Sequence, residues 1–172
     1  MFDLKIHGGM VFDGRGKDAV RTDVGVQGDR IAAVGDLSRG EARSEVDAAG
    51  LYVCPGFVDS HSHSDAYLLL EPSAPSKIHQ GVTTEVVGNC GASAAPRTAR
   101  NRMPSDWLEH KYPGSWQSFA EYRDLLQRVK PAVNAVLLAG HNTLRGGVVG
   151  YENRAATADE RQRLLAQFGR GG

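Results

Sequence analysis

Two apolar segments that each end in metal-binding side chains constrain this fold most. The first runs from Pro55 to His63 and closes with His-Ser-His, and the second runs from Gly81 to Cys90. Because His61 and His63 are two residues apart, an extended chain points both to the same face. Active-site residues gather at the carboxyl ends of parallel strands, so the two imidazoles and the thiol are expected to converge there. Two imidazoles and a thiolate are ligands that suit zinc.

The first 54 residues have the pattern of short β-strands. Apolar alternation marks residues 4–6, 24–26 and 31–34, and residues 27–30 have the composition of a hairpin turn. These strands predict a small antiparallel sheet without catalytic residues.

Residues 55–172 instead alternate between strands and helices. A continuous apolar run at 135–139 predicts a third strand, buried on both faces. The remaining predictions are a helix at 76–80, an irregular loop at 92–114, a helix that opens with the capping box Ser118–Glu121 and ends at Pro131, and a helix that opens with the capping box Thr157–Glu160. This order predicts an α/β fold of parallel units. We therefore divide the chain into two domains, residues 1–54 and 55–172.

Composition and charge narrow the classes of function. The chain has 172 residues, a formal net charge of zero and no basic run, so no nucleic-acid partner is expected. No apolar run approaches the roughly 20 residues needed to cross a bilayer, and the first residues do not resemble a secretory leader. We therefore expect a cytoplasmic protein that does not bind membranes. Two cysteines do not make a disulfide scaffold, and Cys54 is assigned no function.

Two residues near the third predicted strand are candidates for substrate binding. His141 follows this strand at the same edge of the sheet, and it could contact substrate, bind metal or be an ordinary polar residue. Arg145 could receive a carboxylate, whose geometry a guanidinium matches, or it could be a surface arginine.

These segments together resemble the amidohydrolase superfamily, and specifically its D-aminoacylase (N-acyl-D-amino-acid deacylase) branch. The resemblance rests on residues 55–65, 81–93 and 140–145, and it extends to about Leu165. The His-x-His pattern indicates the superfamily alone. The Gly-Asn-Cys-Gly sequence around Cys90 is more specific, because this branch uses a cysteine as metal ligand.

The resemblance implies a small N-terminal β-sandwich portion followed by the first three β/α units of a metal-dependent (β/α)8 barrel. It implies that His61 and His63 bind one metal position and that Cys90 replaces the bridging lysine or acid of other branches. It also implies that Asp59 orients one of the metal ligands without binding the metal itself. The implied cofactor is one or two Zn²⁺ ions, and the implied substrate is a small N-acyl-D-amino acid. The implied reaction is hydrolysis of its amide bond, for which zinc lowers the pKa of water to about 7.

The chain departs from the family pattern after its third predicted strand. A (β/α)8 barrel takes roughly 250 residues, more than this whole chain has. The family's later metal-binding histidines, and the aspartate that acts as general base, are expected beyond Gly172. We therefore expect an amino-terminal part with an open barrel edge, little turnover of its own, and self-association or aggregation through exposed apolar surface.

Two alternatives remain open at this stage. One is another amidohydrolase, such as a hydantoinase-like or dihydroorotase-like enzyme, although Cys90 in place of a lysine counts against it. The other is a non-catalytic remnant that binds metal or forms oligomers, which the missing aspartate favours.

Overall fold

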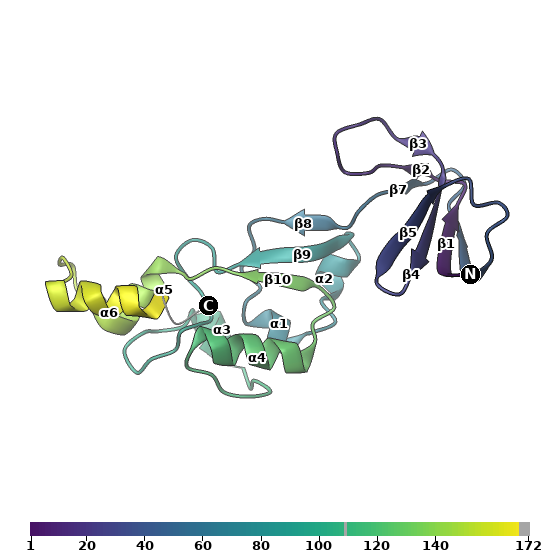
Figure 1. The fold of residues 1–172 in the computed structure, drawn as a ribbon. Coiled ribbons are helices and arrows are strands. Elements are labelled where there is room, and N and C mark those ends of the chain that lie inside the picture. Colours follow the sequence, from purple (N-terminus) through teal and green to yellow (C-terminus); the bar gives the residue numbers. More distant parts are fainter. Residues whose placement is uncertain (109, 169–172) are drawn as a thin grey trace. The chain divides into compact units, whose positions relative to one another are not determined.

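The computed structural model describes residues 1–108 and 110–168. The chain divides into two compact units, Met1–Pro55 and Gly56–Gly172 (Figure 1). The first unit is built from short strands, whereas the second combines a small sheet with helices. No helix of the described ranges is both long and apolar enough to cross a membrane.

The first unit contains a four-stranded sheet in the order β5-β4-β1-β6. Its strands are β1 (Phe2–His7), β4 (Asp23–Gln27), β5 (Arg30–Gly35) and β6 (Ala42–Asp47). The predicted hairpin is confirmed, because Gln27 pairs with Arg30 where β4 and β5 meet. The predicted antiparallel pairing of the three strands β1, β4 and β5 is confirmed, but the sheet also contains β6, which was not predicted and pairs with β1 in parallel. β6 is mostly polar and exposed, so it lacks the apolar alternation that would have identified it.

A second, three-stranded sheet of this unit has the order β3-β2-β7. Its strands are β2 (Met10–Val11), β3 (Val20–Arg21) and β7 (Tyr52–Val53). β2 pairs antiparallel with β3 and parallel with β7, so this sheet is mixed as well.

The sheet of the second unit consists of three parallel strands in the order β10-β9-β8. These are β8 (Phe57–Asp59), β9 (Val82–Val87) and β10 (Asn134–Leu137). The helices are α1 (Tyr67–Leu70), α2 (Pro75–Ile78), α3 (Ser105–Leu108), α4 (Phe119–Val129), α5 (His141–Val148) and α6 (Ala158–Phe168). β9 has the predicted bounds, and α2 begins one residue earlier and ends two residues earlier than predicted. Parallel strands linked by helices agree with the α/β prediction.

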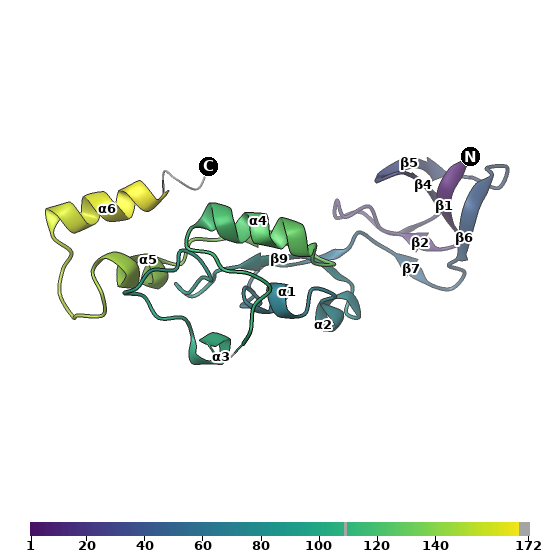
Figure 2. The same ribbon diagram turned by 90° about the horizontal axis from the view of Figure 1, so that it is seen from below.

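One face of this sheet carries the core. Helices α1 and α4 lie on the same face of the sheet (Figure 1, Figure 2), where their leucines pack with Tyr122, Trp116 and Val87. Leu137 of β10 also packs against this cluster. The irregular segment predicted at 92–114 is confirmed in most of its length, but it contains α3, whose Trp107 is buried in the same core.

The opposite face of the sheet is open in the described part of the chain. Val58, Val136 and Leu138 are 62%, 47% and 41% exposed. The prediction that the third strand is buried on both faces is therefore wrong. Because successive side chains of a strand alternate between faces, helices on one face leave Val136 without cover.

Capping boxes begin α4 and α6 as predicted. The Ser118 hydroxyl accepts a hydrogen bond from the Glu121 N–H at 3.2 Å, and the Glu121 carboxylate accepts one from the Ser118 N–H at 2.9 Å. Thr157 and Glu160 make the equivalent pair at 3.2 and 2.8 Å. α4 ends at Val129, directly before Lys130 and Pro131.

Replacing Ser118 by alanine is expected to lower the free energy of unfolding by about 1 kcal/mol, because one N–H of the first turn of α4 loses its acceptor. Urea unfolding followed by circular dichroism measures this change. Ser115→Ala is the matched control, since Ser115 is exposed and lies outside the helix. Equal effects of the two substitutions would contradict a capping role.

Candidate metal centre

Two short loops bring three metal-binding side chains together. His61 and His63 follow the end of β8, and Cys90 follows the end of β9, so both loops start at the carboxyl ends of neighbouring parallel strands. One ligand atom from each residue lies within 4.8 Å of the other two. Nε2 of His61 is 3.2 Å from Sγ of Cys90. All three side chains are exposed and open to a ligand.

The three donors fit a zinc ion by their chemistry and their spacing. Zinc binds imidazole nitrogen at about 2.0–2.1 Å and thiolate sulfur at about 2.3 Å, so donors of one site must lie within a few ångströms of each other. The cluster of His61, His63 and Cys90 meets this requirement. Three protein ligands and an open fourth position are typical of catalytic zinc sites rather than of structural ones.

The backbone of Cys90 has an uncommon conformation. Its φ is +54°, and the glycines on either side, Gly88 and Gly91, have φ values of +86° and +80°. A residue with a β-carbon in this left-handed region costs about 1–3 kcal/mol, and such residues concentrate at functional sites. The thiol is therefore kept at a position where glycine would be less strained, which supports a chemical role for it.

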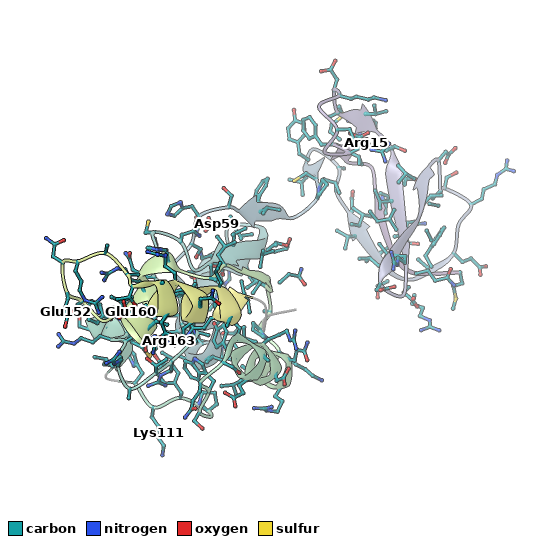
Figure 3. The ribbon with its side chains drawn as sticks, turned by 60° about the vertical axis from the view of Figure 1, so that its left-hand side comes forward. Arg15, Asp59, Lys111, Glu152, Glu160 and Arg163 are labelled. Atoms are coloured by element: carbon teal, nitrogen blue, oxygen red, sulfur yellow. The ribbon has the colours of Figure 1, made fainter. Side chains whose placement is uncertain are left out.

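Asp59 supports the backbone of the His61 loop. Its carboxylate accepts a hydrogen bond from the His61 N–H at 3.2 Å and pairs with Nζ of Lys77 at 2.7 Å (Asp59 is labelled in Figure 3). The hydrogen bond from Lys77, followed by that from His61, lowers the pKa of Asp59. Asp59 therefore acts on the main chain of a ligand residue, and its predicted role in orienting that ligand stays a prediction.

Sequence reasoning missed three ionisable residues that are bonded to the two loops or to one another: Asp65, Lys77 and Glu85. Burial raises the pKa of Asp65, although N–H groups of Ala94 and Gly88 oppose this effect. Burial would lower the pKa of Lys77, but hydrogen bonds to Asp59 and Glu85 outweigh it and raise the pKa. One signal was present in the sequence, because Glu85 is the single charged residue of the otherwise uncharged strand β9.

A cavity of about 510 Å³ adjoins the two histidines. Its lining includes His61, His63, Tyr67 and Lys77, so it offers imidazole, phenol and ammonium groups beside the donor cluster. This space can receive a small polar molecule next to the donors.

The two candidate substrate-binding residues lie on α5, outside the donor cluster. His141 is the first residue of α5 and is exposed. The start of α5 is fixed to the Cys90 loop, because the Thr143 N–H donates to the Gly91 carbonyl at 3.1 Å.

The guanidinium of Arg145 is engaged within its own segment. It donates hydrogen bonds to the carbonyl oxygens of Gly150, Glu152 and Arg154 at 2.8, 2.9 and 2.7 Å. Arg154 in turn pairs with the carboxylates of Glu152 and Glu160, which are labelled in Figure 3. Arg145 therefore stabilises the turn between α5 and α6, and substrate binding by this residue stays a prediction.

Comparison with known proteins gives a consistent result. A model of the amidohydrolase family matches residues 44–171. A D-aminoacylase of Alcaligenes xylosoxydans xylosoxydans is 48% identical over 160 residues, which are 92% of this chain and 33% of that protein. An N-acyl-D-aspartate deacylase of the same organism is 42% identical over 167 residues, 95% of this chain and 33% of that protein.

Solved structures show the same similarity. A D-aminoacylase studied for its binuclear metal center matches with a TM-score of 0.89 and 48% identity, over 97% of this chain and 35% of that one. An N-acyl-D-glutamate deacylase from Bordetella bronchiseptica, complexed with zinc and a phosphonate inhibitor, matches with a TM-score of 0.90 and 36% identity, over 99% of this chain and 36% of that one. The chain thus spans about a third of the length of these relatives.

Proposed function

This chain belongs to the amidohydrolase family, and from that premise we propose that it forms the metal-binding, amino-terminal part of an enzyme that hydrolyses the amide bond of N-acyl-D-amino acids. The observation that carries the proposal is the convergence of His61, His63 and Cys90. Three relatives that are 41–48% identical, a D-aminoacylase, an N-acyl-D-aspartate deacylase and an N-acyl-D-glutamate deacylase, are named for N-acyl-D-amino-acid chemistry, which supports this substrate class.

Each ligand residue has a defined role in the proposed centre. His61 and His63 would bind through neutral imidazoles and Cys90 through its thiolate, so protons compete with the metal and affinity falls as the pH is lowered. The chemistry that a bound Zn²⁺ supplies is acidification of water and polarisation of the amide carbonyl. Asp59 would hold the backbone of His61 in place. No described residue is assigned as general base, and an aspartate beyond Gly172 remains the prediction.

The proposal extends to the fold. We assign residues 1–54 to a β-sandwich portion and residues 55–172 to the first part of a (β/α)8 barrel. The three parallel strands and the open sheet face around Val136 support this assignment, because the inner face of a barrel strand is covered only by other strands of the barrel. Self-association through this face is a prediction of the same proposal.

The metal content of the purified 172-residue chain is expected to be about one tightly held zinc ion per chain, because the three described ligands are already close together. Elemental analysis after dialysis measures this number. Dialysis at acidic pH should remove the ion, because protons displace it from its ligands. A chain that retains no zinc at neutral pH would contradict the proposed centre.

A chimera tests the proposed reaction. In it, the matched part of this chain replaces the corresponding third of the Alcaligenes D-aminoacylase, which supplies the remaining residues. We expect zinc-dependent release of free amino acid from N-acetyl-D-amino acids, and none from their L-enantiomers. The same chimera with Cys90→Ala is the matched control. A folded, metal-loaded chimera without hydrolysis would overturn the proposed function.

A further inference from the structure

A buried carboxylate of the first ligand loop reaches across to the second. Asp65, two residues after His63, is 1% exposed. Its Oδ2 accepts a hydrogen bond from the Gly88 N–H at 3.1 Å, and its Oδ1 accepts one from the Ala94 N–H at 3.2 Å. These two N–H groups lie on either side of Cys90 in the chain, so one carboxylate fixes both ends of the loop that carries the thiol.

A second buried carboxylate reaches in the opposite direction. Glu85 of β9, the strand that leads to Cys90, is fully buried. Its Oε2 accepts hydrogen bonds from the hydroxyls of Ser62 and Ser64, at 2.6 Å each. These serines alternate in sequence with His61 and His63. Glu85 therefore holds the residues between and after the two imidazole ligands.

Burying the carboxylates of Asp65 and Glu85 costs free energy, and their bonding partners offset this cost. A buried carboxylate needs a counter-charge or several hydrogen bonds. Nζ of Lys77 lies 3.2 Å from Oε2 of Glu85, whereas Oε1 of Glu85 has no partner among the described residues. Asp65 has no ion pair in the described chain and is satisfied by main-chain N–H groups alone. Buried ion pairs add little net stability, but they can select one conformation.

We infer that Asp65 and Glu85 are positioning residues that hold the metal ligands in their binding geometry before the metal arrives. Together they form a crossed brace: Asp65 of the first ligand loop holds the Cys90 loop, and Glu85 of β9, the strand before Cys90, holds the loop of the two histidines. The inference rests on the metal centre proposed above. Ligands that are already in place lose little freedom on binding, so the brace raises metal affinity without contacting the ion.

Cobalt(II) binding to the 172-residue chain tests the brace. Titration followed by the thiolate-to-cobalt absorption band gives the dissociation constant and a signature of Cys90 coordination. For Asp65→Asn, which turns an acceptor into an amide donor facing an N–H, we expect binding about 10–100-fold weaker. Glu85→Ala should weaken binding to a similar extent. Glu85→Gln keeps one acceptor oxygen for the serines and should restore affinity close to that of the unsubstituted chain.

The matched control is Glu121→Gln, which alters a carboxylate that also accepts main-chain N–H bonds, at the start of α4. It should change the urea midpoint and leave the cobalt dissociation constant unchanged. If Glu85→Ala does not fold, the double variant Ser62→Ala/Ser64→Ala replaces it, because it removes the two hydroxyls that Glu85 holds, and a 10–100-fold loss is again expected.

Two results would overturn the inference in different ways. Folded Asp65→Asn and Glu85→Ala chains that bind cobalt as tightly as the unsubstituted chain would refute the brace and leave the metal centre standing. An unsubstituted chain without the thiolate-to-cobalt band would refute the metal centre, and the brace with it.

Discussion

Replacing Cys90 by alanine is expected to abolish tight zinc binding by this chain. Changes to groups that only support metal ligands weaken binding about 10–100-fold, so removal of a ligand should exceed 100-fold. The thiolate is also the single anionic donor of the three-residue cluster, so its loss removes the charge that complements the ion. Zinc per chain after dialysis, together with competition against a chelator, measures the loss.

The chain supplies its own control for this experiment. Cys54 is the other cysteine, it is also exposed, and it lies in the first compact unit. Cys54→Ala should leave the zinc content unchanged, which separates loss of a ligand from loss of a thiol. Unchanged zinc content in Cys90→Ala would refute the assignment of Cys90 as a ligand.

Replacing Gly88 by alanine is expected to lower the free energy of unfolding by about 2–4 kcal/mol. Gly88 has a φ of +86°. A β-carbon on it would lie 2.2 Å from the main-chain carbonyl oxygen of Leu138. That oxygen belongs to the backbone just after β10, so the clash is relieved only by moving the two chain segments apart. Urea unfolding of the metal-free chain measures the change.

Gly150→Ala is the matched control for Gly88→Ala. Gly150 has a similar φ of +89°, but a β-carbon there would meet no atom within 4 Å. Its substitution should cost only the conformational penalty of about 1 kcal/mol. The difference between the two variants then reports the contact with Leu138. Equal destabilisation would contradict this explanation.

The sequence correctly predicted those helices and strands that depend on residues close together in the chain. The β-branched run of β9 gave its bounds, and the capping boxes gave the starts of α4 and α6, because propensity and capping act over a few residues. β6 was missed because its residues are mostly polar, and it is held by pairing with β1, about 40 residues earlier in the chain. Exposure of Val136 was missed because it depends on what covers the sheet and not on the strand itself.

The difference between features set by nearby residues and features set by distant contacts also applies to the metal centre. The positions of His61, His63 and Cys90 at strand ends were sufficient to predict that they meet, because the parallel sheet carries them to one edge. Asp65 could not be assigned, since its partners are main-chain N–H groups more than 20 residues away. No sequence pattern marks such a bond. The partners of Arg145 are only five, seven and nine residues away, but they are main-chain carbonyl oxygens, which no sequence pattern marks either.

The three ligand residues lie close together in the sequence, and this determines when the ribosome completes the donor set. All three lie between residues 61 and 90, whereas Gly140, whose N–H donates to Ser93, follows about 50 residues later. At 5–20 residues per second, a ribosome takes roughly 3–10 s to add those residues. The donor set therefore exists before α5 arrives to fix the Cys90 loop. Asp65, Glu85 and the groups that they bind lie within residues 62–94, so the supports of the donor set are also synthesised before α5.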